Sequence, residues 1–141
     1  MAGKYLSILV HFTWSTARRE PWLGNIGGIV NNKRAKLISA GGMYDHIHLY
    51  ASLPSTISIA DFVNAVKSNS SRWIHESYPR CRQFGWQEGY GAFSVSKSEE
   101  QRVIRYINNQ ENHHRKRTFK EELVTLLDKH GIEYDKRFLW D

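Results

Sequence analysis

The chain has one cysteine, three prolines and no apolar run long enough to cross a membrane. Its single cysteine, Cys81, excludes an internal disulfide framework and suits a reducing compartment. Crossing a bilayer takes about 18 consecutive apolar residues, and the start from Met1 to Tyr5 has no secretory apolar segment. We therefore expect a soluble, cytoplasmic protein.

Internal repeats, low-complexity segments and long linkers are also missing, which favours a single domain over residues 1–141. Apolar residues make up 40% of the chain, enough for a real core at this length. Basic residues outnumber acidic residues by 20 to 14, which gives a formal net charge of +6. This balance favours a polyanionic partner such as nucleic acid.

Hydrophobic periodicity predicts a β-sheet with helices packed on it. We expect strands over residues 6–13, 35–40, 46–51 and 90–95, with a Gly41-Gly42 turn between the second and third. Helices are expected over about 58–78, 99–117 and 118–130. Each helix follows a capping pattern, formed by Ser58 and Asp61, Ser96 and Glu99, and Thr118 and Glu121.

Two histidines, His46 and His48, lie one residue apart in a predicted strand, so their side chains point to the same face. Ile47, Leu49 and Ala51 point to the other face, where they can line a core while the histidines stay reachable. Two imidazoles at this spacing can hold a metal ion. The pattern alone is equally consistent with buried histidines that only satisfy hydrogen bonds.

Gln110 and Tyr106 are four residues apart on a predicted helix and so share one helix surface. The Gln110 carbonyl could complete a site with the two histidines, leaving positions open for a phosphate oxygen on Mg²⁺ or Mn²⁺. Tyr106 would then lie beside that phosphate, where its phenolate could attack phosphorus. The residues by themselves also fit a packed tyrosine and a surface amide.

These motifs resemble the single-tyrosine HUH transposases of small insertion sequences, the TnpA type. The His-hydrophobic-His strand of that family is similar to residues 42–49, and its tyrosine helix is similar to residues 106–114. Residues 67–71 and 84–94 are also similar to family segments. The resemblance runs from about Tyr5 to Asp141, and the order and spacing of both motifs make it specific.

The resemblance implies an α+β fold with a ferredoxin-like or RRM-like antiparallel sheet. It implies a transposase that cleaves single-stranded DNA and transfers strands at hairpins near element ends. His46, His48 and Gln110 would hold Mg²⁺ or Mn²⁺, and Tyr106 would form a 5′-phosphotyrosine. Family members act as homodimers, often pairing the histidines of one subunit with the tyrosine helix of the other.

The basic side chains acquire a DNA-binding role under this hypothesis, although each also fits a solvated surface. The candidates are Lys67, Arg72, Arg102, Arg105, Arg115 and Lys116. His11, on a neighbouring predicted strand, would hydrogen-bond to a metal ligand without binding the metal itself. His113 and His114 are adjacent in a predicted helix and point about 100° apart, so they cannot bind one metal ion together as His46 and His48 could.

The chain departs from the family pattern between Pro21 and Arg34, which is short by roughly one average helix. Glycine and asparagine are frequent there, so any helix near residues 29–34 is expected to be short. The main alternative is a domesticated or inactive RRM-like nucleic-acid-binding protein without strand transfer. A histidine phosphohydrolase is disfavoured because Tyr50 stands where an HxHxH run needs its third histidine.

Overall fold

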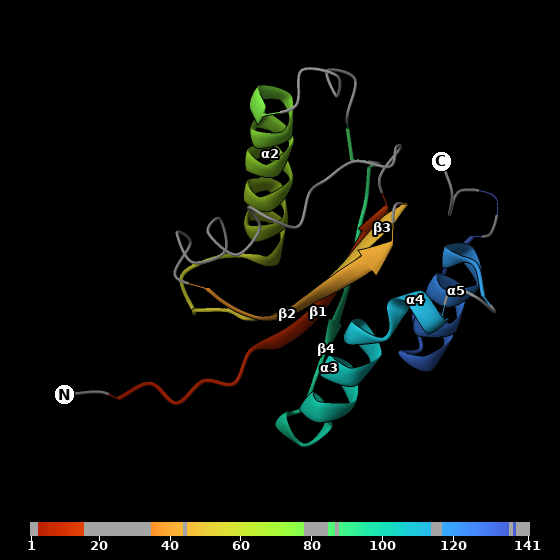
Figure 1. Ribbon diagram of the computed structural model, residues 1–141. Helices are drawn as coiled ribbons and strands as arrows, with labels where there is room; N and C mark the ends of the chain where they lie inside the picture. Colours follow the sequence, from red (N-terminus) through yellow and green to blue (C-terminus); the bar gives the residue numbers. More distant parts are fainter. Residues whose placement is uncertain are drawn as a thin grey trace.

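The computed structural model describes residues 3–15, 35–43, 45–77, 85–86, 88–113, 117–135 and 137 (Figure 1). The strands are β1 (Leu9–Ser15), β2 (Lys36–Met43), β3 (His46–Ser52) and β4 (Gly91–Ser94). The helices are α2 (Ile59–Ser77), the 3-10 helix η3 (Lys97–Glu99), α3 (Glu100–Asn108), α4 (Gln110–His113) and α5 (Phe119–Lys129). Expectations for Cys81, His114, Arg115, Lys116, the His113 side chain and the Pro21–Arg34 segment lie outside this description.

The four strands form one antiparallel sheet in the order β2-β3-β1-β4. The first strand therefore lies between the third and the fourth, which is the strand order of a ferredoxin-like sheet. Helix α2 makes the crossover from β3 to β4. The predicted α+β class, an antiparallel ferredoxin-like or RRM-like sheet with helices packed on it, is confirmed.

Helix α2 covers one face of the sheet, and α3, α4 and α5 lie on the other (Figure 1). Alternation along β3 turns Ile47, Leu49 and Ala51 towards the α2 side, where they join the main core with Phe62 of α2. The Phe62 ring lies 4.9 Å from that of Phe12 and is fully buried. Burial of one such side chain stabilises the fold by about 1.5–3 kcal/mol.

The apolar cluster on the second face of the sheet is smaller, and this face is more polar. Tyr50 of β3 packs with Leu9 and Ile107, and its hydroxyl donates to Glu100 Oε2 at 2.9 Å. A close approach at Gly41 brings α3 against β2, because a Cβ there would lie 2.4 Å from the carbonyl oxygen of Ile107. This contact places α3 over β2, beside the strand that carries the histidines.

The predicted hairpin turn at Gly41-Gly42 is wrong, because both glycines belong to β2. They pair with His48 and Ile47 of β3, and the chain turns between Met43 and His46. Two adjacent glycines are a turn signal in sequence, but here the missing side chain of Gly41 lets α3 approach the strand, and Gly42 has a φ of +146°. The longer strand pairs with β3 up to Met43, opposite His46, with one register shift between Leu37 and Ser39.

The predicted helix over residues 99–117 is also wrong as a single element. Helix α3 ends at Asn108, Asn109 leaves helical geometry, and α4 begins at Gln110. Ser39 of β2 donates to the Asn108 side chain at 3.1 Å, and Gln110 is buried against β3. These contacts with the sheet favour the break over a continuous helix.

The capping predictions had different outcomes. Thr118 and Glu121 form the predicted capping box at the start of α5, and Ser58 Oγ accepts from the Asp61 backbone N–H at 3.1 Å. The prediction at Ser96 is wrong, because its hydroxyl makes no capping bond and pairs with Ser98. In the described part of the chain, no helix combines the length and apolar character needed to cross a membrane.

Candidate metal centre and tyrosine site

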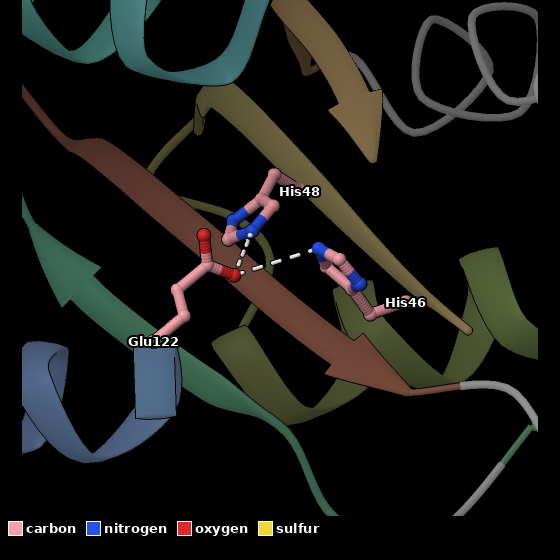
Figure 2. A group of neighbouring side chains, drawn as sticks. All are labelled: His46, His48 and Glu122. Carbon is pink, nitrogen blue, oxygen red and sulfur yellow. Dashed lines mark hydrogen bonds and ion pairs between the residues drawn. The ribbon is translucent and has the colours of Figure 1, made fainter. Parts of the chain in front are cut away.

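Three buried side chains meet between the sheet and α5: His46 and His48 from β3, and Glu122 from α5 (Figure 2). We call them the His/Glu cluster. Glu122 Oε1 lies 2.7 Å from His48 Nε2 and 3.4 Å from His46 Nε2. One potential ligand atom from each residue lies within 4.8 Å of the other two. Such a spacing suits three ligands of one cation.

Gln110 joins the cluster as the first residue of α4. Its Oε1 lies 3.0 Å from His46 Nε2, and its amide nitrogen donates to the Tyr106 carbonyl oxygen at 3.3 Å. The donation to Tyr106 is what directs the amide oxygen at the histidine. The structure therefore brings the predicted set of His46, His48 and Gln110 together within one chain.

Lone pairs of His46, Gln110 and Glu122 point towards one another. Its Nδ1 lies 2.8 Å from Asp45 Oδ1, so in a neutral imidazole this nitrogen carries the proton and donates it. His46 Nε2 then presents a lone pair to the oxygens of Gln110 and Glu122. The repulsion between these lone pairs is relieved by one positive charge, which is either a proton on His46 or a cation between the groups. Two imidazoles, a carboxylate and an amide oxygen suit a divalent cation such as Mn²⁺ or Mg²⁺.

Tyr106 of α3 lies at the edge of the cluster. Its hydroxyl donates to Glu122 Oε2, whereas Oε1 of the same carboxylate lies beside the histidines, and its ring centroid lies 5.6 Å from that of His48. Burial, followed by the charge and hydrogen bond of Glu122, raises the pKa of Tyr106 above its ordinary value of 10. The hydroxyl thus stays protonated in this arrangement.

Glu122 connects the histidines to the tyrosine, one carboxylate oxygen towards each. Burial raises the pKa of Glu122, but the hydrogen bond and charge of His48, together with Tyr106 and His46, outweigh it and lower the pKa from 4.5 to about 2. The side chain is therefore an anion in a buried site. A buried carboxylate surrounded by donors is a strong candidate ligand for a cation.

Glu122 was missed by the sequence reasoning. It follows the capping residue Glu121 and looks like one more first-turn acid of α5. A signal was present, because Phe119 and Leu126 stand three before and four after it, on the inward side of an amphipathic helix. An acidic residue on that side has to find a partner in the interior.

His11 of β1 lies beside His48, with 2.8 Å between His11 Nε2 and His48 Nδ1. Burial, with a smaller contribution from His48, lowers the pKa of His11 from 6.5 to about 3, so His11 is neutral at pH 7. When a neutral His48 donates from Nε2 to Glu122, its Nδ1 must accept from His11. When His48 Nε2 faces a cation, its proton must move to Nδ1 and be donated to His11.

The expectation that the histidines stay reachable is wrong for this arrangement. Both His46 and His48 are fully buried. The ring of Phe119 stacks on His46 with 4.4 Å between centroids and 15° between planes. Helices α4 and α5 cover this face because Gln110 and Glu122 provide polar partners for the imidazoles.

The predicted DNA-binding residues fall on two sides of the sheet. Arg102 and Arg105 are exposed on α3, the tyrosine helix. Lys67 and Arg72 belong to α2, on the opposite face. Lys67 Nζ donates to the Gly89 carbonyl at 2.8 Å, and burial lowers its pKa. Among the candidates that the structure describes, only Arg102 and Arg105 therefore lie on the face of the sheet that carries the His/Glu cluster.

Fold and site together define a class: a ferredoxin-like α+β protein whose sheet carries a pair of histidines facing a tyrosine helix. A family model described as "Transposase IS200 like" matches residues 4–110, most of the chain. The chain belongs to the IS200-like transposase family. The resemblance found in the sequence motifs is thereby confirmed.

Curated relatives are similar over part of their length. The chain is 31% identical to the ISDra2 transposase TnpA of Deinococcus radiodurans over 80 residues, which are 53% of this chain. It thus spans 57% of that relative. It is 27% identical to the transposase for insertion sequence element IS200 of Salmonella typhimurium over 107 residues, covering 66% of this chain and 69% of the relative.

Solved structures show the same fold. A transposase structure from Deinococcus radiodurans has a TM-score of 0.61 at 24% identity and covers 78% of this chain and 95% of its own. The REP-associated tyrosine transposase bound to a REP hairpin has a TM-score of 0.59 at 13% identity. It covers 81% of this chain and 73% of its own.

Proposed function

We propose that this transposase cleaves single-stranded DNA with Tyr106 as the nucleophile and rejoins it through a 5′-phosphotyrosine. One observation carries the proposal: the Tyr106 hydroxyl shares the Glu122 carboxylate with His48, one of the candidate metal ligands. A phosphate held at the His/Glu cluster would therefore lie beside a hydroxyl able to attack it. Family membership supports the same chemistry.

His46, His48, Glu122 and Gln110 would hold the divalent cation, Mg²⁺ or Mn²⁺. When bound, the ion would polarise the scissile phosphate and neutralise developing charge. His11 would fix the Nδ1–H form of His48, so that the Nε2 lone pair faces the ion. All of these side chains come from strands or from the first turns of helices, which suits precise positioning.

In the cleavage step the Tyr106 hydroxyl oxygen attacks phosphorus and the bond from phosphorus to the 3′-oxygen breaks. The products are a 5′-phosphotyrosine and a free 3′-hydroxyl. Glu122 Oε2 accepts a hydrogen bond from the tyrosine hydroxyl and so orients its oxygen. The tyrosine proton is lost as the new bond forms, and the departing 3′-oxygen gains one proton, so the step balances. A carboxylate whose pKa is about 2 is a weak base for a phenol whose pKa is raised, so Glu122 positions the hydroxyl.

Strand transfer is the reverse reaction with a different 3′-hydroxyl as the attacking group. The phosphotyrosine keeps the energy of the original phosphodiester, so no nucleotide cofactor is needed. The basic residues Arg102 and Arg105 on α3 would contact the strand, and Lys67 and Arg72 would contact more distant DNA.

The DNA substrate proposed is a single strand that carries a hairpin. A structural neighbour, the REP-associated tyrosine transposase, is bound to a REP hairpin, and the net charge of +6 suits such a partner. We also propose a homodimer. Each chain would nevertheless hold a complete set of ligands, since Gln110 reaches His46 of its own chain.

The test mixes the protein, Mn²⁺ and labelled hairpin oligonucleotides, and looks for a protein–DNA adduct that survives denaturation. Wild type and Tyr90→Phe, which changes an exposed tyrosine, should both form it. Tyr106→Phe should bind the same DNA and form none, and EDTA should abolish the adduct. Binding without any adduct by the wild type would favour the RRM-like binding protein. An adduct with Tyr106→Phe would exclude Tyr106 as the nucleophile.

A further inference from the structure

A pocket of about 530 Å³ opens directly beside Tyr106, between β4, α3 and α5. We call it the β4/α3/α5 pocket. Tyr106, Glu122 and His11 all line it, so it continues from the His/Glu cluster. Its volume falls within the range typical of sites for small organic ligands. A group bound there would lie next to the proposed nucleophile.

The walls of this pocket are apolar and partly aromatic. Phe93 of β4 and Leu126 of α5 both line it. The His130 ring, at the end of α5, lies 4.6 Å from the Phe93 ring with 31° between their planes. A flat ring on such a wall offers a stacking surface for a base, and stacking is largely independent of base identity.

Cationic side chains accompany these walls. Arg102 of α3, Arg117 before α5 and Lys129 near the end of α5 line the pocket, against the acidic Glu99 and Glu122. The Arg117 guanidinium donates to Thr125 Oγ1 at 2.8 Å, which holds it at the wall. Glu122 is already engaged by His48 and Tyr106. The pocket thus combines apolar walls with cations, the pattern of a nucleotide site.

We propose that the β4/α3/α5 pocket receives one nucleotide of the single strand, next to the phosphate that Tyr106 attacks. The base would stack against the exposed His130 ring, which itself packs on Phe93, and its phosphate would meet Arg102, Arg117 and Lys129. This assignment rests on the proposed function, because the position of the strand is inferred from Tyr106. A strand whose phosphate reaches Tyr106 must place a neighbouring nucleotide nearby. The pocket would then help to choose where the strand is cut.

Photo-crosslinking of the full chain tests the assignment without any need for cleavage. A single-stranded oligonucleotide containing 5-iodouracil is bound without divalent metal and irradiated, and the attached residues are mapped by mass spectrometry. Crosslinks should fall on Phe93 or His130. Leu126→Trp, which fills the pocket, should reduce these crosslinks at least about fivefold, the lower range of stacking effects. Crosslinks confined to other parts of the chain would overturn the assignment.

A second pair of variants avoids the core, so the test does not depend on the folding of Leu126→Trp. Arg102→Gln with Lys129→Gln removes two cations of the pocket, whereas Lys36→Gln with Lys120→Gln removes two exposed cations outside it. The first pair should weaken binding of the strand at least about threefold more than the second, and reduce its salt dependence further. Equal effects of the two pairs would count against the pocket.

The adduct assay, run in parallel, separates the two proposals. An adduct on Tyr106 together with crosslinks only outside the pocket would support the proposed enzyme and reject the proposed nucleotide pocket. Crosslinks at Phe93 or His130 without an adduct support the pocket as a nucleotide site and remove the strand-transfer mechanism.

Discussion

The Tyr106 hydroxyl donates a hydrogen bond to Glu122, sixteen residues later in the chain and on a different helix. The other oxygen of the same carboxylate contacts His48. A single buried anion therefore links the proposed nucleophile to the candidate metal ligands. Under the proposed function, Glu122 would both bind the cation and orient the tyrosine hydroxyl.

Replacing Glu122 with Gln should weaken Mn²⁺ binding at least about tenfold, because a neutral amide oxygen replaces an anionic ligand. Isothermal titration calorimetry measures the affinity, and circular dichroism reports whether the fold is kept. The matched control is Glu133→Gln, which neutralises an exposed carboxylate outside the cluster. Equal affinities of E122Q and wild type would show that the carboxylate is not a ligand.

His11→Phe should lower Mn²⁺ affinity by about tenfold to a hundredfold, the usual scale for residues that support a metal ligand. The phenyl ring fills the same space but cannot accept from His48 Nδ1. Nitrogen-15 NMR of the imidazoles should show His48 protonated at Nδ1 in wild type loaded with Mg²⁺, which is diamagnetic. His75→Phe, on α2 across the sheet, serves as the control. Unchanged affinity in H11F would remove His11 from the site.

Gly41→Ala should destabilise the protein by about 1–3 kcal/mol, the usual cost of overpacking. The new methyl group would meet the Ile107 carbonyl oxygen, which is backbone and cannot rotate away. Helix α3 would have to move, and Tyr106 with it, so adduct formation should also slow. Urea unfolding measures the first effect. Gly85→Ala, where a Cβ meets nothing within 4 Å, should behave like wild type.

Glu100→Gln should lower stability at pH 7 and much less at acidic pH. Hydrogen bonds from Lys97 and Tyr50 lower the pKa of Glu100 below its ordinary 4.5. As the pH falls, the unfolded chain takes up this proton first, so the stabilisation is lost as the pH passes through the folded value. Urea unfolding at pH 7 and at strongly acidic pH should therefore converge for wild type and variant. A gap independent of pH would contradict this account.

Much of the fold was open to prediction from local pattern. Alternation in β3 placed Ile47 and Leu49 on one face and both histidines on the other, because strand side chains alternate. The capping pair at Thr118 and Glu121 gave the start of α5, since it satisfies backbone groups locally. The break at Asn109 was not predictable in this way, because contacts with the sheet produce it.

For the site, too, local relations were predictable and long-range contacts were not. By itself the sequence determined the spacing of His46 and His48 and that of Tyr106 and Gln110, because these relations depend only on residues close in the chain. Only the tertiary structure decided that His11 contacts His48, that Glu122 joins them to Tyr106, and that helices cover both imidazoles. Those contacts join strands and helices far apart in sequence, and packing of α3 to α5 on the sheet sets them.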